Sequence, residues 1–246
     1  MPRITETMKK REEEMLKALR HLSRKTDGFT KPRMIVIGGY ALRAFISYSR
    51  FTRDCDFIIR KKNRWNLDEL KKIKPEDYII EEEEKLADYG FMRWIKPMQH
   101  DGAKVKVSID LMEGEIRGRK AEERILIDEA LVTTSGYASL SIADAEIKVP
   151  VPSYLDYFIM KVVSSRASDI RDIASLIHEN GIPSKTTERV TQILPHPHIF
   201  KEKLAQNIIP ELEKKTFLYS WRGIFSVTKY TEKEKQQVIA QIQQML

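Results

Sequence analysis

The chain has 246 residues, 41% of them hydrophobic and 32% charged, which is the composition of a globular protein that can bury a substantial core. A single cysteine excludes an internal disulfide framework and favours the reducing cytoplasm, and no apolar run is long enough to span a membrane. The net charge of +7 allows two interpretations of equal weight, a polyanionic partner or Lys and Arg residues that merely solvate the surface.

The first predicted elements are a helix, a strand and a glycine turn. Residues 5–25 carry apolar side chains at helical spacing, which predicts an amphipathic helix packed on the core. Residues 34–37 predict a buried strand, Gly38 and Gly39 a turn, and residues 40–49 a second helix. A strand, a turn and a helix N-terminus bring backbone N–H groups to one point, where a phosphate group can bind.

A pair of aspartates opens the next predicted strand, residues 54–59. Asp54 and Asp56 are two positions apart, so in a strand both carboxylates leave the same face while Cys55 points into the core. Carboxylates beside a phosphate site are the ligands that hold Mg²⁺ or Mn²⁺ against substrate phosphates. A glycine pair or a D-x-D pair alone is a weak signal, but their order along the chain is more specific.

The order of these motifs resembles that of a known enzyme superfamily. Strand, Gly-Gly, helix and R-F-T-x-D-x-D-F are similar to the DNA polymerase β nucleotidyltransferase superfamily. Within it, G-G-Y-A-L at 38–42 and R-F-T-R-D-C-D-F at 50–57 resemble the AbiEii-like abortive-infection toxin branch. The resemblance implies an α/β fold, with a small mixed sheet flanked by helices. It also implies transfer of a nucleoside monophosphate from an NTP to an acceptor hydroxyl, with release of pyrophosphate.

The same resemblance implies a set of nucleotide-binding residues, namely Gly38, Gly39, Tyr40, Arg50 and Thr52. Tyr40 stands where the family often has a small hydroxyl residue. Backbone N–H groups are therefore expected to carry more of the contact with the triphosphate.

The third metal ligand is expected on a later strand. Residues 91–95 and 104–111 alternate in polarity and predict two strands, joined by a turn at 100–102. Asp110 lies on the polar face of the second of these strands, so we expect it to complete the metal site with the aspartate pair. The alternative is a solvent-facing aspartate near a strand end, and Glu113 is the expected substitute ligand.

The predicted domains are a catalytic core with its N-terminal helix, residues 1–152, and a helical region, residues 153–246, that contributes to the active site and to acceptor binding. Lys161 lies well off the apolar stripe of the first helix in the second region.

This chain also has a pattern that resembles a second motif of the same family, namely Asp156, Lys161, Arg166, Asp169 and Asp172. That resemblance implies that Lys161 and Arg166 bind the triphosphate. It further implies that Asp172, or Asp169, orients or deprotonates the acceptor hydroxyl. Judged from position alone, both aspartates are better explained by capping and dipole pairing in the first turn of a helix.

The acceptor is the least determined part of the prediction. Two basic segments, 60–64 and 117–124, could contact phosphates or could simply be solvated. Phe217, Tyr219 and Trp221 could stack on unpaired bases, and a buried face explains them equally well.

By resemblance the acceptor is RNA, in particular a tRNA 3′ end, and the setting is a toxin–antitoxin or phage-defence system with an antitoxin partner. Two alternatives remain. One is a nucleotidyltransferase that modifies a protein or a small molecule such as an aminoglycoside, and the other is a non-catalytic RNA-binding module on the same fold. The presence of all three proposed carboxylates argues against the second alternative.

Overall fold

The computed structural model describes residues 2–47, 50–100 and 102–246. The chain divides into two compact units. The first is made of Met1–Ala44, Phe51–Ile116 and Ile127–Pro152, and the second of Phe45–Arg50, Arg117–Leu126 and Ser153–Leu246. The second unit therefore takes up two short segments in addition to the chain that follows Pro152.

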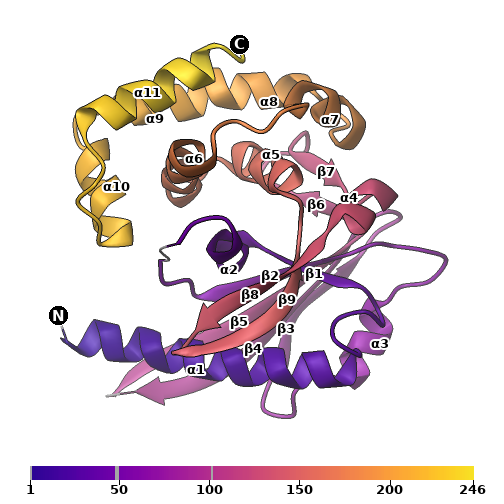
Figure 1. The fold of residues 1–246 in the computed structure, drawn as a ribbon. Helices are drawn as coiled ribbons and strands as arrows, with labels where there is room; N and C mark the ends of the chain where they lie inside the picture. The colour runs from indigo at the N-terminus through magenta and orange to yellow at the C-terminus, as the bar shows by residue number, and fades with distance from the viewer. Residues whose placement is uncertain (1, 48–49, 101) are drawn as a thin grey trace. The chain divides into compact units, whose positions relative to one another are not determined.

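A five-stranded mixed sheet forms the centre of the first unit (Figure 1). Its strands, in spatial order, are β1 (Met34–Ile37), β2 (Asp54–Ile59), β5 (Ala103–Glu113), β4 (Gly90–His100) and β3 (Ile79–Lys85). β2 and β5 run parallel, whereas the other neighbouring pairs are antiparallel. The predicted α/β fold with a small mixed sheet is confirmed. The predicted strands at 91–95 and 104–111 are both present and both longer than expected; residue 101 of their turn lies outside the described residues.

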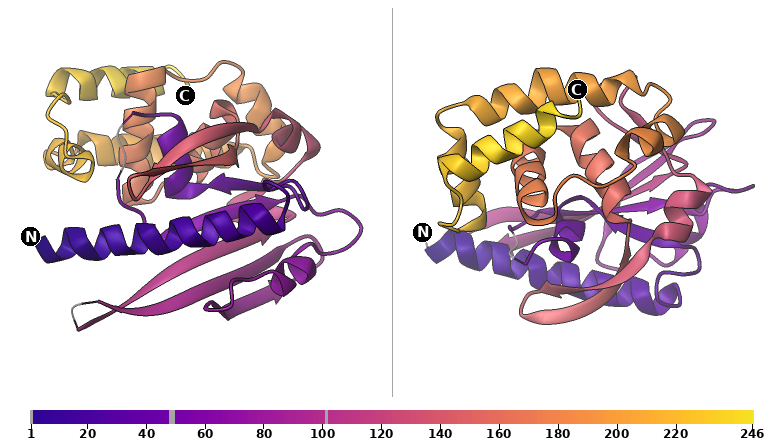
Figure 2. Two further views of the ribbon diagram at one scale, coloured as in Figure 1. Left: turned by 60° about the horizontal axis from the view of Figure 1, so that its bottom comes forward. Right: turned by 45° about the horizontal axis from the view of Figure 1, so that its top comes forward.

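Helices and a hairpin pack against this sheet. The helix α1 (Pro2–Lys25) confirms the amphipathic prediction and buries Met15, Leu19 and Leu22. It contacts β5 and the hairpin of β8 (Gly136–Ile142) and β9 (Ala145–Val151), and it lies along the sheet in both views of Figure 2. The short helices are α3 (Leu67–Lys72) and α4 (Glu129–Thr134).

The helix predicted over residues 40–49 is wrong in its extent. α2 (Gly38–Ala41) starts directly after β1 and continues only as a 3-10 turn over Leu42–Ala44. The chain leaves the helix after Ala44, and the ring of Phe45, which belongs to the second unit, stacks on Tyr157 with centroids 4.8 Å apart. Residues 48 and 49 of the predicted helix lie outside the described residues.

The second unit is mostly helical. Its elements after β6 (Glu115–Arg117) are β7 (Arg124–Leu126), α5 (Tyr154–Ser164), α6 (Ala167–Asn180), α7 (Thr186–Ile193), α8 (His198–Lys203), a π-helical turn (Leu204–Ile208), α9 (Ile209–Glu213), α10 (Phe217–Phe225) and α11 (Glu232–Gln243). Ser153 caps α5 by accepting a hydrogen bond from the backbone of Asp156, as the sequence predicts. None of the helices in the described part of the chain has the length and apolar character needed to cross a lipid bilayer.

Candidate active site

Three aspartates lie on one face of two neighbouring strands in the first unit. In the parallel pairing of β2 with β5, Asp56 is the partner of Asp110 and Asp54 is the partner of Ser108. Residues paired in register point to the same face of a sheet, and residues two apart do so along a strand. Cys55, which lies between the two aspartates of β2, points to the opposite face and is fully buried.

The negative charges of these carboxylates affect the pKa of the Cys55 thiol on the opposite face. The pKa of Cys55 is raised, first by burial and then by the charges of Asp56, Asp54 and Asp110. All three carboxylates are thus close enough to a single point to act on it electrostatically. Carboxylate oxygens are the hard donors that a divalent cation prefers.

The glycine pair is explained by the side chains that pack against it. Gly38 has a φ of +67°, and a Cβ at this position would lie 2.0 Å from Oδ2 of Asp56. A Cβ on Gly39 would lie 2.7 Å from Oγ1 of Thr52, which is itself buried. Both glycines are therefore needed so that the backbone after β1 can approach Asp56 and Thr52.

Asp110 is held by an arginine that the sequence prediction missed. Arg93 on β4 donates hydrogen bonds from Nε to Oδ1 of Asp110 at 2.8 Å and from Nη2 to Oδ2 at 2.6 Å. The hydrogen bonds from Arg93 to Asp110 raise the pKa of the guanidinium group. Within residues 2–47, 50–100 and 102–246, no group of three or more His, Cys, Asp or Glu side chains is arranged to hold a metal ion.

The donor set nevertheless fits a divalent cation in its chemistry. Asp54 and Asp56 are partly exposed on β2 and offer carboxylate oxygens on one face. Asp110 is adjacent to Asp56 in the register, but its two oxygens are bound by Arg93. A cation that used all three carboxylates would have to compete with Arg93 for Asp110.

Glu113 is not a substitute ligand, and that prediction is wrong. Its carboxylate is fully buried and accepts hydrogen bonds from the backbone N–H groups of Asn66 and Leu67, each at 3.0 Å. It lies three positions after Asp110 on β5 and therefore on the opposite face of the strand. Glu113 stabilises the N-terminus of α3, and burial raises the pKa of its carboxyl group in spite of these hydrogen bonds.

Tyr40 contributes no side chain to a nucleotide site. Its ring is buried, 1% exposed, and the guanidinium of Arg43 lies over it at 4.9 Å from the centroid. Burial raises the pKa of its hydroxyl group. The expected contact with a triphosphate is thereby limited to the backbone of Tyr40, as the departure from a small hydroxyl residue implied.

A buried ionic cluster in the second unit joins four of the other predicted site residues. Lys161 on α5 donates to Asp169 at 2.7 Å and to Asp172 at 2.8 Å, both on α6. Arg50 donates from Nε and Nη2 to the two oxygens of Asp172, each at 2.9 Å. Asp172 is fully buried and Lys161 is 4% exposed, so the expectation that Lys161 stands apart from the buried face is wrong.

The charges in this cluster balance one another. Burial alone would lower the pKa of Lys161, but the charges of Asp172 and Asp169 raise it well above its ordinary value. The pKa of Asp169 is lowered, because the charge and hydrogen bond of Lys161 outweigh the effect of burial. Lys161 and Asp169 are therefore both stabilised in their ionised forms.

Two further details concern the start of α6. Asp169 accepts hydrogen bonds from the Ser164 hydroxyl at 2.7 Å and from the backbone N–H of Arg166 at 3.3 Å, so it caps the helix as the simpler explanation expected. The side chain of Arg166 is exposed. Asp172 plays no such part in capping, since its carboxylate is bound by Arg50 and Lys161.

The aromatic group at 217–222 is mainly core. Phe217 and Trp221 are 1% and 0% exposed, and the Trp221 ring stacks on Tyr230 with centroids 3.7 Å apart. Only Tyr219, at 76% exposure, stands free of the core among the three aromatics that were predicted to stack on bases. The base-stacking interpretation is wrong for Phe217 and Trp221, because both side chains are buried. Trp221 donates to Ser175 of α6 and stacks on Tyr230, and the Phe217 ring lies 5.7 Å from that of Trp221.

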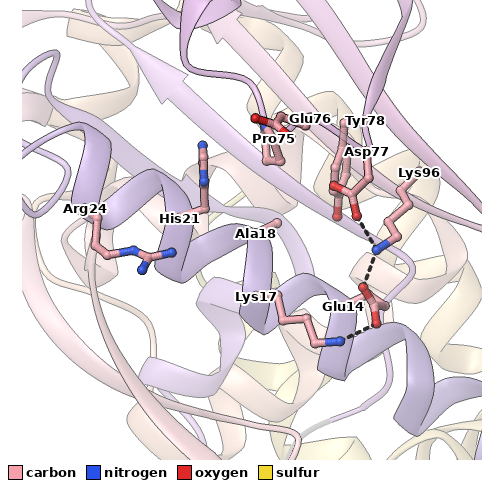
Figure 3. Close-up of a pocket in the computed structure, with 10 residues that line it drawn as sticks. All are labelled: Glu14, Lys17, Ala18, His21, Arg24, Pro75, Glu76, Asp77, Tyr78 and Lys96. Carbon is pink, nitrogen blue, oxygen red and sulfur yellow. Dashed lines mark hydrogen bonds and ion pairs between the residues drawn. The ribbon is translucent and has the colours of Figure 1, made fainter.

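A cavity of about 430 Å³ in the first unit is not lined by Asp54, Asp56 or Asp110 (Figure 3). Within it, Lys96 binds the carboxylates of both Glu14 and Asp77, and Lys17 binds Glu14 at 2.7 Å. Four of its charged side chains, Glu14, Lys17, Asp77 and Lys96, are therefore joined by ion pairs. None of the predicted site residues is among those that line this cavity.

A mixed sheet that carries paired aspartates beside a Gly-Gly turn is the arrangement of a nucleotidyltransferase. Residues 20–225 match the family model described as the nucleotidyl transferase AbiEii toxin of type IV toxin–antitoxin systems. The chain therefore belongs to the AbiEii nucleotidyltransferase family, whose members generally use an NTP and a divalent metal.

Two solved structures from Helicobacter pylori are also similar to the chain. One is described as a candidate nucleotidyltransferase and the other as JHP933. Each is 13% identical, with a TM-score of 0.46, over 95% of this chain and 92% of the other. No curated protein matches the chain.

Proposed function

We propose that this AbiEii-family enzyme transfers a nucleoside monophosphate from an NTP to a hydroxyl group of RNA, in particular a tRNA 3′ end, in a reaction that depends on Mg²⁺ or Mn²⁺. The observation that carries the proposal is the placement of Asp54, Asp56 and Asp110 on one face of β2 and β5, with Gly38 against Asp56. Pyrophosphate is the leaving group.

Asp54 and Asp56 would hold the divalent cation. Asp110 would be the third ligand once its hydrogen bonds with Arg93 are broken. The cation supplies neutralisation of charge on the phosphoryl group that is transferred. Gly38 and Gly39 carry no side chain, so the backbone after β1 packs directly against Asp56 and Thr52. Its N–H groups would bind a phosphate group of the NTP. Thr52 packs on Gly39 and supports that turn.

We propose that three residues of the ionic cluster, Arg50, Lys161 and Asp172, act together. Both cations bind the same carboxylate, so a change at any one of the three alters the position of the other two. The geometry favours Asp172 as a group that positions Arg50 and Lys161 over one that takes a proton, because its oxygens are already bound. Lys161 and Arg166 as contacts of the triphosphate remain predictions.

The biological setting of the proposal is a type IV toxin–antitoxin system, with an antitoxin as partner and the cytoplasm as the compartment. RNA as acceptor is supported by the net charge of +7. A protein or small-molecule acceptor is the alternative, and it predicts transfer that is insensitive to competing RNA.

The test is a labelling experiment with the purified full chain. It is incubated with Mg²⁺, each of the four α-labelled NTPs in turn, and total cellular RNA, and the labelled product is separated by size and by nuclease and protease sensitivity. We expect label in an RNA band that requires both Mg²⁺ and the wild-type aspartates. Label in a protein or in a small molecule, with none in RNA, would overturn the proposed acceptor.

A further inference from the structure

A basic loop in the second unit is the strongest feature outside the candidate active site. Residues 117–124 enclose a cavity of about 380 Å³, which is lined by Arg117, Gly118, Arg119, Lys120, Ala121 and Arg124. No Asp or Glu is among these lining residues in the part of the chain that the structure describes. The cavity therefore collects positive charge from one short segment.

The loop is held in shape by one buried carboxylate. Glu123, 3% exposed, accepts a hydrogen bond from the backbone N–H of Arg119 at 2.9 Å and forms an ion pair with Lys203 at the end of α8. Burial would raise the pKa of Glu123, but the hydrogen bond and charge of Lys203 lower it. Of the two carboxylates in the segment, Glu123 thus binds the scaffold, whereas Glu122 is exposed.

Gly118 belongs to the same scaffold. Its backbone N–H donates to the carbonyl of Glu123 at 2.6 Å, and a Cβ on Gly118 would lie 2.4 Å from Oε2 of Glu123. The turn therefore closes tightly around the carboxylate. Arg119 and Lys120 are exposed, and the backbone that carries them is already fixed by Glu123. Binding of an anion by these two side chains therefore costs little conformational entropy of the backbone.

We propose that this basic loop binds the phosphodiester backbone of the RNA acceptor, an inference that rests on the proposed function. Several cations along one segment match a chain of phosphates, whose contacts fix position without reading sequence. The lining offers no aromatic ring and only one apolar side chain, Ala121, so it lacks the surface that would hold the base of a free nucleotide. The RNA backbone is therefore the ligand that the loop fits best.

The test measures RNA binding by the full chain with a fluorescent bulk tRNA probe over a series of salt concentrations. The double variant Arg119→Ala/Lys120→Ala removes two exposed cations and leaves Glu123 and Gly118 in place. We expect its Kd for the probe to rise about tenfold near 0.15 M salt, with a slope of log K against log salt that is smaller by about 1 to 2. Its Kd for NTP in the presence of Mg²⁺ should match that of the wild type.

The matched control is Lys214→Ala/Lys215→Ala, which removes the same charge from two exposed lysines of the same unit. Equal weakening by both double variants, or no weakening by the first, would overturn the inference. A raised Kd for NTP in the first variant would also overturn it, because the loop would then be a nucleotide site. If the Arg119→Ala/Lys120→Ala variant labels RNA as the wild type does, the proposed function stands and only this inference is wrong. If the wild type itself labels no RNA, the proposed acceptor is wrong, and the inference that depends on it is wrong as well.

Discussion

Arg93 on β4 binds both carboxylate oxygens of Asp110 on β5, at 2.8 Å and 2.6 Å. A bidentate pair of this kind fixes the plane of the carboxylate as well as its charge. Asp110 is thereby positioned next to Asp56 in the sheet register while its charge is already compensated. Arg93 is a positioning residue that stands in competition with any cation for the same oxygens.

The first prediction concerns this competition. Arg93→Gln removes the guanidinium and leaves the carboxylate of Asp110 without its bidentate partner, so we expect the free energy of unfolding to fall by about 1–3 kcal/mol. The uncompensated carboxylates should then bind a divalent cation more tightly. We expect Mg²⁺ or Mn²⁺ to raise the Tm of this variant by more than it raises that of the wild type.

The double variant Arg93→Gln/Asp110→Asn is the control for the first prediction. It lacks the carboxylate that Arg93 releases, so the additional stabilisation by the cation should disappear. Equal shifts of Tm by Mg²⁺ in the wild type and in both variants would show that Asp110 is not a metal ligand.

The second prediction concerns the aspartate pair on β2. Asp54→Asn and Asp56→Asn should each reduce nucleotidyl transfer to background, because an amide is a poor ligand for a hard divalent cation. Both changes keep the size of the side chain on a half-exposed position, so the unfolding transition should stay within about 1 kcal/mol of the wild type. The control is Asp88→Asn, whose side chain is 88% exposed in the same unit. Near-normal turnover in either active-site variant would remove the pair from the mechanism.

The aspartate pair could be predicted from sequence because its signal is local. A period of two within an apolar β-branched run places Asp54 and Asp56 on one face whatever the rest of the chain does. The contact of Arg93 with Asp110 was also within reach, since a hairpin that turns at 100–102 pairs these two residues. The prediction considered only the acidic side of the hairpin, and so it missed the arginine.

The ionic cluster of the second unit could not be predicted in the same way. Helical periodicity puts a polar residue such as Lys161 outside the buried stripe, and that inference fails when the charge has buried partners. One of those partners, Asp172, is bound in turn by Arg50 at a sequence separation of 122 residues. Only tertiary packing brings these groups together. The burial of Trp221 depends on Tyr230 and α6 for the same reason.

The third prediction tests that cluster. Lys161→Ala leaves the fully buried Asp172 with Arg50 alone and takes from Asp169 its cation, so we expect the free energy of unfolding to fall by about 3–5 kcal/mol. Urea denaturation measures the change. Lys233→Ala, at an exposed position on α11 of the same unit, should fall within about 0.5 kcal/mol of the wild type. Equal and small effects of both changes would mean that the ion pairs of Lys161 do not stabilise the fold.

The fourth prediction follows from the lowered pKa of Asp169. A carboxyl group with a lowered pKa in the folded state adds stability at pH values above its unfolded pKa of about 3.9, and this contribution is lost as the pH falls through the folded pKa. Asp169→Asn should therefore be less stable than the wild type at neutral pH, and the difference should narrow below about pH 4. Urea unfolding at a series of pH values gives both curves. Parallel curves down to the lowest pH would show that Asp169 does not contribute in this way.

The last prediction concerns Gly38, where backbone and site chemistry meet. An alanine there would have to hold a φ of +67° and would place its Cβ 2.0 Å from Oδ2 of Asp56. The strain should cost more than about 1 kcal/mol of stability. The displaced carboxylate should lower kcat/KM by about 100-fold, since a shift of about 1 Å in a positioning group has that effect. Gly136→Ala is the matched control, because a Cβ at Gly136 meets no atom within 4 Å and the backbone there needs no positive φ. If Gly38→Ala loses stability but keeps a normal kcat/KM, the glycine serves the fold alone. If the stability and the kcat/KM of Gly38→Ala both fall while Gly136→Ala stays at wild-type values, the glycine at position 38 is what holds Asp56 in its catalytic position.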